Sequence, residues 1–131
     1  MSVIISEIDL ERDLTVHTAT GEITKQDFVN KIRDHYQKQS TRLVLWDIEN
    51  ASIKDLIFEE ILEFSKDIKA FSSADRRVAL LCSNPYENGV LKMLKVILDM
   101  NRYETQVYIC EKKSDAIKWL FEIEDGNETV K

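Results

Sequence analysis

The residue best placed to act as a nucleophile is Cys82, which lies just before a helix start expected at Asn84-Pro85. A thiol near a helix N-terminus can have a lowered pKa and become reactive. Catalysis would also require a base, but His17 falls in an early strand and His35 in the first helix, where we expect surface or boundary positions. We therefore expect Cys82 to be a buried structural residue, because free cysteine is among the most buried residue types.

A second candidate site is the polar segment 49–55, which we expect to form a loop after a buried strand that ends at Asp47. Ligands in open α/β sheets favour this edge, because backbone N–H groups and a helix dipole converge there. Ser52 is the one hydroxyl of the segment and could accept a phosphate, although the simpler interpretation is that it caps the next helix, as Asp55 also could. The candidates at this edge for a regulatory loop, or for the rim of a small-molecule or lipid pocket, are Asp47, Asn50, Ser52, Asp55 and Asn84.

Familiar catalytic motifs are absent from the sequence. The three glycines are too far apart to form a phosphate-binding loop, and neither a GxSxG nucleophile motif nor an HExxH zinc motif occurs. Glu59 and Glu60 are adjacent on an expected helix, so their carboxylates point apart. The two cysteines, Cys82 and Cys110, form no CxxC pair. The sequence therefore predicts no enzyme, no metal site and no cofactor.

The composition indicates one globular domain. A chain of 131 residues with 44% hydrophobic and 32% charged residues is ordinary for such a domain. The net charge of −6, with Lys and Arg interspersed among Asp and Glu, argues against nucleic acid as a partner. No apolar run approaches the roughly 18 residues of a membrane span, and the N-terminus has no basic leader. We therefore expect a cytoplasmic protein.

The elements that must position the candidate residues follow the order β-β-α-β-α-β-α-β-α. Runs rich in β-branched residues predict strands at about 3–10 and 14–19, and continuous apolar runs predict buried strands at about 43–47 and 77–82. A final strand is expected at about 105–110. Apolar stripes at helical spacing predict helices at about 24–39, 54–71, 84–101 and 114–121, with Thr24, Asn84 and Ser114 as N-caps. Gly21 is expected to end the initial hairpin. Alternating strands and helices imply an α/β fold with a mostly parallel mixed sheet flanked by helices and one antiparallel strand at its start.

The second and third helices are more apolar than a helix with one buried face requires. Phe58 and Leu62 lie on a flank of the second helix that a solvated helix would make polar. Met93, Val96 and Met100 widen the apolar arc of the third helix in the same way. These flanks either pack against each other or form an exposed patch. An exposed patch would be a docking surface, a dimer surface or the mouth of a lipid pocket.

The element order resembles the STAS domain, the fold of the SpoIIAA-like anti-sigma-factor antagonists, from about Ile4 to Phe121. Residues 43–48, Leu-Val-Leu-Trp-Asp-Ile, look like the STAS strand that ends in an Asp-Leu pair before the regulatory loop. Residues 86–93, followed by 116–120, look like an uncharacterised, SpoIIAA-like bacterial subgroup. The resemblance implies a STAS-like domain over residues 1–123 and a polar C-terminal tail over 124–131.

The resemblance also implies where a phosphorylation switch would lie. In antagonists of this family an Asp-Ser pair begins the helix after the regulatory loop, and the Ser is phosphorylated by a partner kinase. Asp55 matches the acidic residue, but Leu56 stands where the Ser would be, and a leucine has no hydroxyl to phosphorylate. We therefore expect a non-catalytic interaction module that binds another protein or itself as a homodimer. The alternative is a domain that binds a small hydrophobic molecule.

Overall fold

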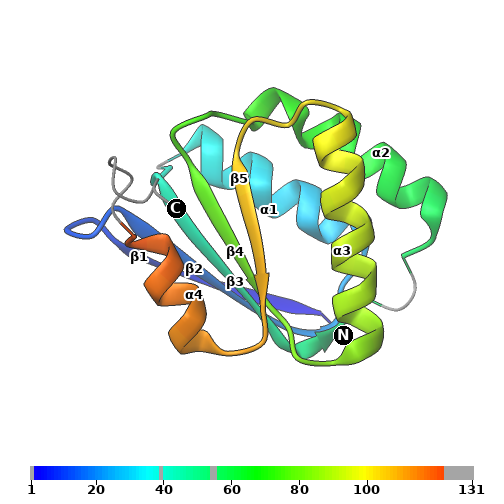
Figure 1. Ribbon diagram of the computed structural model, residues 1–131, viewed down its shortest axis with the longest axis horizontal. Helices are drawn as coiled ribbons and strands as arrows, with labels where there is room; N and C mark the ends of the chain where they lie inside the picture. Colours follow the sequence, from blue (N-terminus) through cyan, green and yellow to red (C-terminus); the bar gives the residue numbers. More distant parts are fainter. Residues whose placement is uncertain (1, 39, 54–55, 123–131) are drawn as a thin grey trace, which may run out of the picture.

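The computed structural model describes residues 2–38, 40–53 and 56–122. A five-stranded sheet with the order β1-β2-β3-β4-β5 forms its centre, and only β1 runs antiparallel to its neighbour (Figure 1). The strands are β1 (Val3–Asp9), β2 (Leu14–Glu22), β3 (Leu43–Ser52), β4 (Arg77–Leu81) and β5 (Gln106–Cys110). The helices are α1 (Lys25–Gln37), α2 (Phe58–Ile68), the short 3₁₀ helix η1 (Lys69–Phe71), α3 (Pro85–Met100) and α4 (Lys113–Leu120). The predicted α/β class and element order are confirmed.

The strand order explains why three helices share one face of the sheet. From β2 to β5 every parallel strand is added on the same side of the last, and right-handed crossovers then place α1, α2 and α3 on one face. The last helix, α4, follows β5 and packs on the opposite face against β3, β4 and β5 (Figure 1). Two apolar cores result, one beneath each helical layer. No helix among the described residues is long and apolar enough to cross a membrane.

The predicted caps of the first and third helices are confirmed. The Thr24 hydroxyl accepts the N–H of Asp27 at 3.2 Å, and the Asp27 carboxylate accepts the N–H of Thr24 at 2.9 Å. This reciprocal pair satisfies two of the N–H groups at the start of α1. At the start of α3, Asn84 caps the first turn and Pro85 occupies the first helical position. The predicted cap Ser114 is wrong, because α4 begins one residue earlier, at Lys113.

The predicted end of the third strand at Asp47 is wrong. Strand β3 continues through Ser52 and pairs with an extension of β2, so residues 49–52 belong to the sheet. The extra length is stabilised by Ile48 and Ala51, which are buried, while the polar residues between them face solvent. A bulge lets β3 use one more residue than β2 in this stretch. Gly21, expected to end the hairpin, instead pairs within β2 at a φ of 82°.

The predicted start of the second helix at residue 54 is also wrong. Ile57 has an extended backbone, and α2 begins at Phe58. The Ile57 N–H donates to the Glu60 carboxylate at 3.4 Å, which closes the first turn. Residues 54–55, including the candidate Asp55, lie outside the described residues. The same holds for the tail 124–131.

Candidate functional site

Helices α2 and α3 carry the first candidate surface. They lie side by side over the sheet, and the Asn101 amide, just after α3, donates to the Ser65 hydroxyl of α2 at 2.8 Å. Phe58 and Leu62 precede Ser65 by seven and three residues, so they lie on the flank of α2 that faces α3. Phe58 is exposed, whereas Leu62 is half-buried and packs against the core.

The apolar residues Met93, Val96 and Met100 of α3 are exposed, with exposed fractions of 37%, 57% and 75%. Of the five flank residues that the sequence indicated on α2 and α3, four are therefore exposed and only Leu62 is half-buried. We call Phe58, Leu62, Met93, Val96 and Met100 the α2–α3 surface.

The carboxyl edge of the sheet holds a second, shallow candidate site. Asn50, Ser52 and Asn84 line one open depression, together with Gly21, Glu49, Ala51, Tyr86 and Glu87. The structure thus brings three of the sequence-predicted residues together. Asp47 does not line the depression, and its carboxylate instead accepts the backbone N–H of Glu49 at 3.1 Å.

The polar groups of this edge are used to join strands to helix α3. The Glu49 carboxylate accepts the backbone N–H and the hydroxyl of Ser83 at 2.6 and 3.2 Å. The buried Glu87 carboxylate accepts the N–H of Ile53 at 2.9 Å. The side-chain oxygen of Asn84 accepts the backbone N–H groups of Tyr86 and Glu87 in the first turn of α3. Two carboxylates in the same depression disfavour a phosphate there, whether on a ligand or on Ser52.

The thiol of Cys82 is not a nucleophile at neutral pH. Cys82 is fully buried, as predicted, and its Sγ contacts the carbonyl oxygen of Asn84 at 4.0 Å. Burial raises the pKa of Cys82, and the nearby carboxylates of Glu87 and Glu49 raise it further. Burial also raises the pKa of Cys110, to about 11. Both thiols are therefore protonated core groups.

The expected surface or boundary positions of His17 and His35 are wrong, because both side chains are buried, His17 on β2 and His35 on α1. Their rings lie edge to face with centroids 5.4 Å apart, and His17 packs 4.4 Å from the ring of Trp46. Burial lowers the pKa of His17 to about 3 and lowers the pKa of His35 as well, so both rings are neutral at pH 7. The spacing of the two histidines from buried residues could have predicted their burial. His17 shares its strand face with the buried Ala19, and His35 follows Phe28 by seven residues, or two helical turns.

Comparison with solved structures finds the same fold in two very different sequences. An uncharacterised protein of the DUF3478 family with a SpoIIAA-like fold, from Shewanella loihica PV-4, is 15% identical with a TM-score of 0.55, over 91% of this chain and 93% of that chain. The anti-sigma factor antagonist SpoIIAA in its unphosphorylated form is 16% identical with a TM-score of 0.56, over 92% of this chain and 100% of that chain. No family model and no curated protein matches the sequence. The chain therefore has the SpoIIAA-like, STAS-type fold that its element order predicted.

Proposed function

We propose that the chain is a non-catalytic regulatory module that binds a partner protein through the α2–α3 surface. The observation that carries this proposal is the exposure of Phe58, Met93, Val96 and Met100 on two adjacent helices. Exposed apolar side chains that gather in one place mark interaction sites, whereas single ones are ordinary. Two of the four are methionines, whose flexible side chains adapt to a partner's shape.

The similarity to SpoIIAA supports a protein as the occupant. That protein is an anti-sigma factor antagonist, and a module with the same fold offers comparable helical surfaces. The phosphorylation switch would be missing at Leu56, which is half-buried and whose N–H donates to the Ile53 carbonyl at 3.1 Å. Binding would then be controlled by the partner's abundance or by a second ligand. A cytoplasmic location is part of the same proposal.

The test is a double variant on the α2–α3 surface, Phe58→Glu with Met93→Glu. Both side chains are exposed, so the variant should fold, and circular dichroism checks this. The matched control places the same two charges on exposed apolar residues elsewhere, Ile5→Glu with Leu10→Glu. The wild type and the control should capture the same protein from the native host. The F58E/M93E variant should capture at least tenfold less of it.

Sedimentation velocity on the purified proteins separates a partner from self-association. A dimer that F58E/M93E dissociates and the control leaves intact would show that the occupant is a second copy of the chain. Equal capture by the surface variant and the control, with a monomer throughout, would exclude the α2–α3 surface as the binding site.

A further inference from the structure

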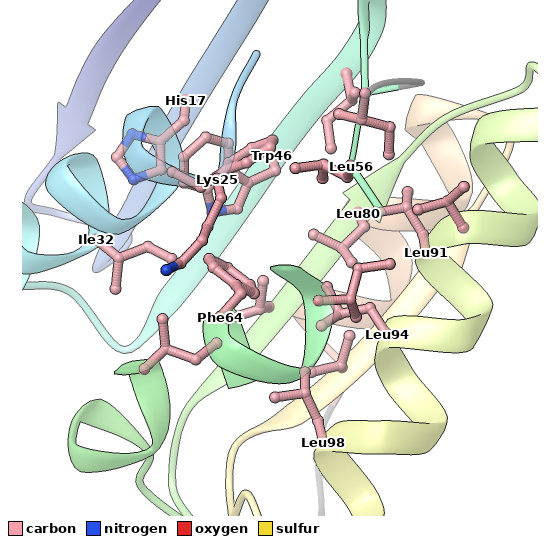
Figure 2. A pocket seen from close by; sticks show the side chains of 18 of the residues that line it. His17, Lys25, Ile32, Trp46, Leu56, Phe64, Leu80, Leu91, Leu94 and Leu98 are labelled. Atoms are coloured by element: carbon pink, nitrogen blue, oxygen red, sulfur yellow. The ribbon is translucent and has the colours of Figure 1, made fainter. Parts of the chain in front are cut away.

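An apolar cavity of about 90 Å³ lies between the sheet and helices α1, α2 and α3 (Figure 2). Figure 2 shows Leu91, Leu94 and Leu98 of α3 on one side, Phe64 of α2 near the middle, and His17 and Trp46 at the other end. Protein interiors are close-packed, with few voids larger than a water molecule. A void of this size in the centre of a core is therefore a feature that requires an explanation.

One end of the cavity carries a ring nitrogen without a partner. His17, His35 and Trp46 all line the cavity and are 2%, 8% and 5% exposed. The Ser6 hydroxyl is hydrogen-bonded to Nδ1 of His17 at 2.8 Å. Within the described part of the chain, Nε2 of His35 is a buried nitrogen with no hydrogen-bond partner. Buried polar groups almost always have a hydrogen-bond partner, so this unpaired nitrogen indicates a missing partner.

A single water molecule explains only part of this arrangement. Water needs two to four polar partners, and beside the histidines the lining offers polar atoms of Lys25, Tyr36, Glu60 and Tyr103. The rest of the lining is apolar, so a single water would leave most of the cavity empty. Several lining residues, Leu56 among them, are only partly buried, so the cavity is not fully enclosed. A mainly apolar cavity with a few polar atoms fits a small organic molecule better than water.

We propose that this cavity binds a small, mainly apolar molecule with a single hydroxyl group, which hydrogen-bonds Nε2 of His35 beside His17 and Trp46. A hydroxyl both donates and accepts, so it suits either tautomer of the imidazole ring. The size is bounded by comparison, because a dry cavity of about 150 Å³ admits benzene and this cavity is smaller, at about 90 Å³. The ligand is therefore smaller than benzene and carries a short alkyl chain. This site is separate from the α2–α3 surface, and either assignment can fail without the other.

The test compares 2-propanol with 2-chloropropane, which share a carbon skeleton and differ in the hydroxyl group. The two tryptophans provide the readout, because Trp46 lines the cavity and Trp119 lies in the other core. In ¹H–¹⁵N spectra the indole signal of Trp46 should shift and saturate with 2-propanol, while that of Trp119 stays in place. 2-Propanol should bind about five- to tenfold more tightly than 2-chloropropane, as one hydrogen bond predicts.

A cavity-filling variant locates the binding. Leu94→Phe places a ring in the cavity and should weaken 2-propanol binding more than tenfold, with dispersed spectra showing that it folds. Ile117→Phe makes a similar enlargement at the half-buried edge of the other core and should leave binding unchanged. If Leu94→Phe fails to fold, Ile32→Phe on α1 fills the same cavity.

Three results would overturn the assignment. The first is no saturable shift of Trp46 with either probe, which would leave water or an empty void. The second is unchanged binding in the cavity-filling variant, which would place the probe elsewhere. The third is equal affinity for 2-propanol and 2-chloropropane, which would remove the hydrogen-bonding role of His35.

Discussion

Two pairs of neighbouring helices cover the same face of the sheet, α1 with α2 and α2 with α3. The two seams between them differ in the side chains that they expose. At the α1–α2 seam, Lys25 binds Glu63 at 3.1 Å and Asp67 at 3.3 Å, and below them Phe28 and Phe64 meet edge to face at 6.1 Å. At the α2–α3 seam, α3 instead exposes the apolar side chains of Val96 and Met100. The first seam is sealed by charges within the chain, and the second presents apolar side chains to solvent.

The difference shows that fold stability does not dictate the outer residues of a helical layer. Exposed ion pairs contribute little to stability, so the charges on Glu63 and Asp67 serve mainly to keep the seam polar. Exposed apolar residues at a seam would be tolerated by the fold and would cost solubility. Their presence at only one of the two seams is what an interaction surface requires.

The largest expected difference between the seams is in the free energy of unfolding lost when one phenylalanine at each seam is truncated to alanine. Phe64→Ala removes a half-buried ring that packs on Phe28, and should lower the free energy of unfolding by about 3 kcal/mol. Phe58→Ala removes an exposed ring and should change it by less than about 0.5 kcal/mol. Urea unfolding followed by circular dichroism measures both. If the two losses are equal, Phe58 is a core residue and the α2–α3 surface is not open.

The α1 side should also be the acid-sensitive part of the helical layer. Burial, with the charges of His35 and Lys31, lowers the pKa of His17 from 6.5 to about 3. Below pH 6.5, His17 therefore becomes protonated in the unfolded chain, whereas in the folded chain it stays neutral down to about pH 3. The contribution of neutral His17 to the free energy of unfolding is complete above pH 6.5 and decreases as the pH falls, by about 2 kcal/mol at pH 5. No described residue of α2 or α3 is a histidine, so their seam lacks this effect.

Urea unfolding at pH 7, 6 and 5 tests this, with His17→Gln as the comparison. The variant should be less stable at pH 7 but lose clearly less stability between pH 7 and pH 5 than the wild type. Equal slopes for the two proteins would mean that His17 is protonated as readily in the fold as in the unfolded chain.

The fold could be predicted largely because its signals are local. Thr24 and Asn84 indicate helix starts because their side chains cap the first turns of α1 and α3. The continuous apolar run from Leu43 indicates a buried strand. Residues 49–52 were missed because Glu49 and Asn50 are polar, and a bulge breaks the alternation that would identify a strand. A bulge depends on the partner strand, which the local pattern does not contain.

The candidate surfaces could be predicted only in part. The apolar flanks of the second and third helices are visible in the spacing of Phe58, Met93 and Met100. Their exposure depends on how far apart the helices pack, which follows from the size of the residues beneath them and not from periodicity. His17 and His35 were expected at surface or boundary positions from their places in an early strand and the first helix, although their spacing matched buried neighbours. The cavity beside them arises from the sheet and three helices at once and has no local signature.

A smaller change in the free energy of unfolding is expected from substituting Gly89, which lies on α3 one helical turn before Met93. A Cβ built at Gly89 meets nothing within 4 Å, and its φ is not positive. Gly89→Ala should therefore raise the free energy of unfolding by about 0.5–1 kcal/mol. If a partner packs against the bare backbone, the same variant should bind it less tightly. A destabilised G89A protein would contradict the open space seen around this residue.

The smallest effect is expected from opening the charged seam. Lys25→Met removes the ion pairs to Glu63 and Asp67, which are 65% and 46% exposed in their side chains. The free energy of unfolding should fall by no more than about 0.5 kcal/mol in 50 mM salt, and the difference from wild type should shrink in 1 M salt because the charges are screened. Urea unfolding at the two salt concentrations measures both values. A loss of several kcal/mol that persists in 1 M salt would show that Lys25 holds α1 and α2 together through packing of its aliphatic stem, and the two seams would then differ in strength as well as in polarity.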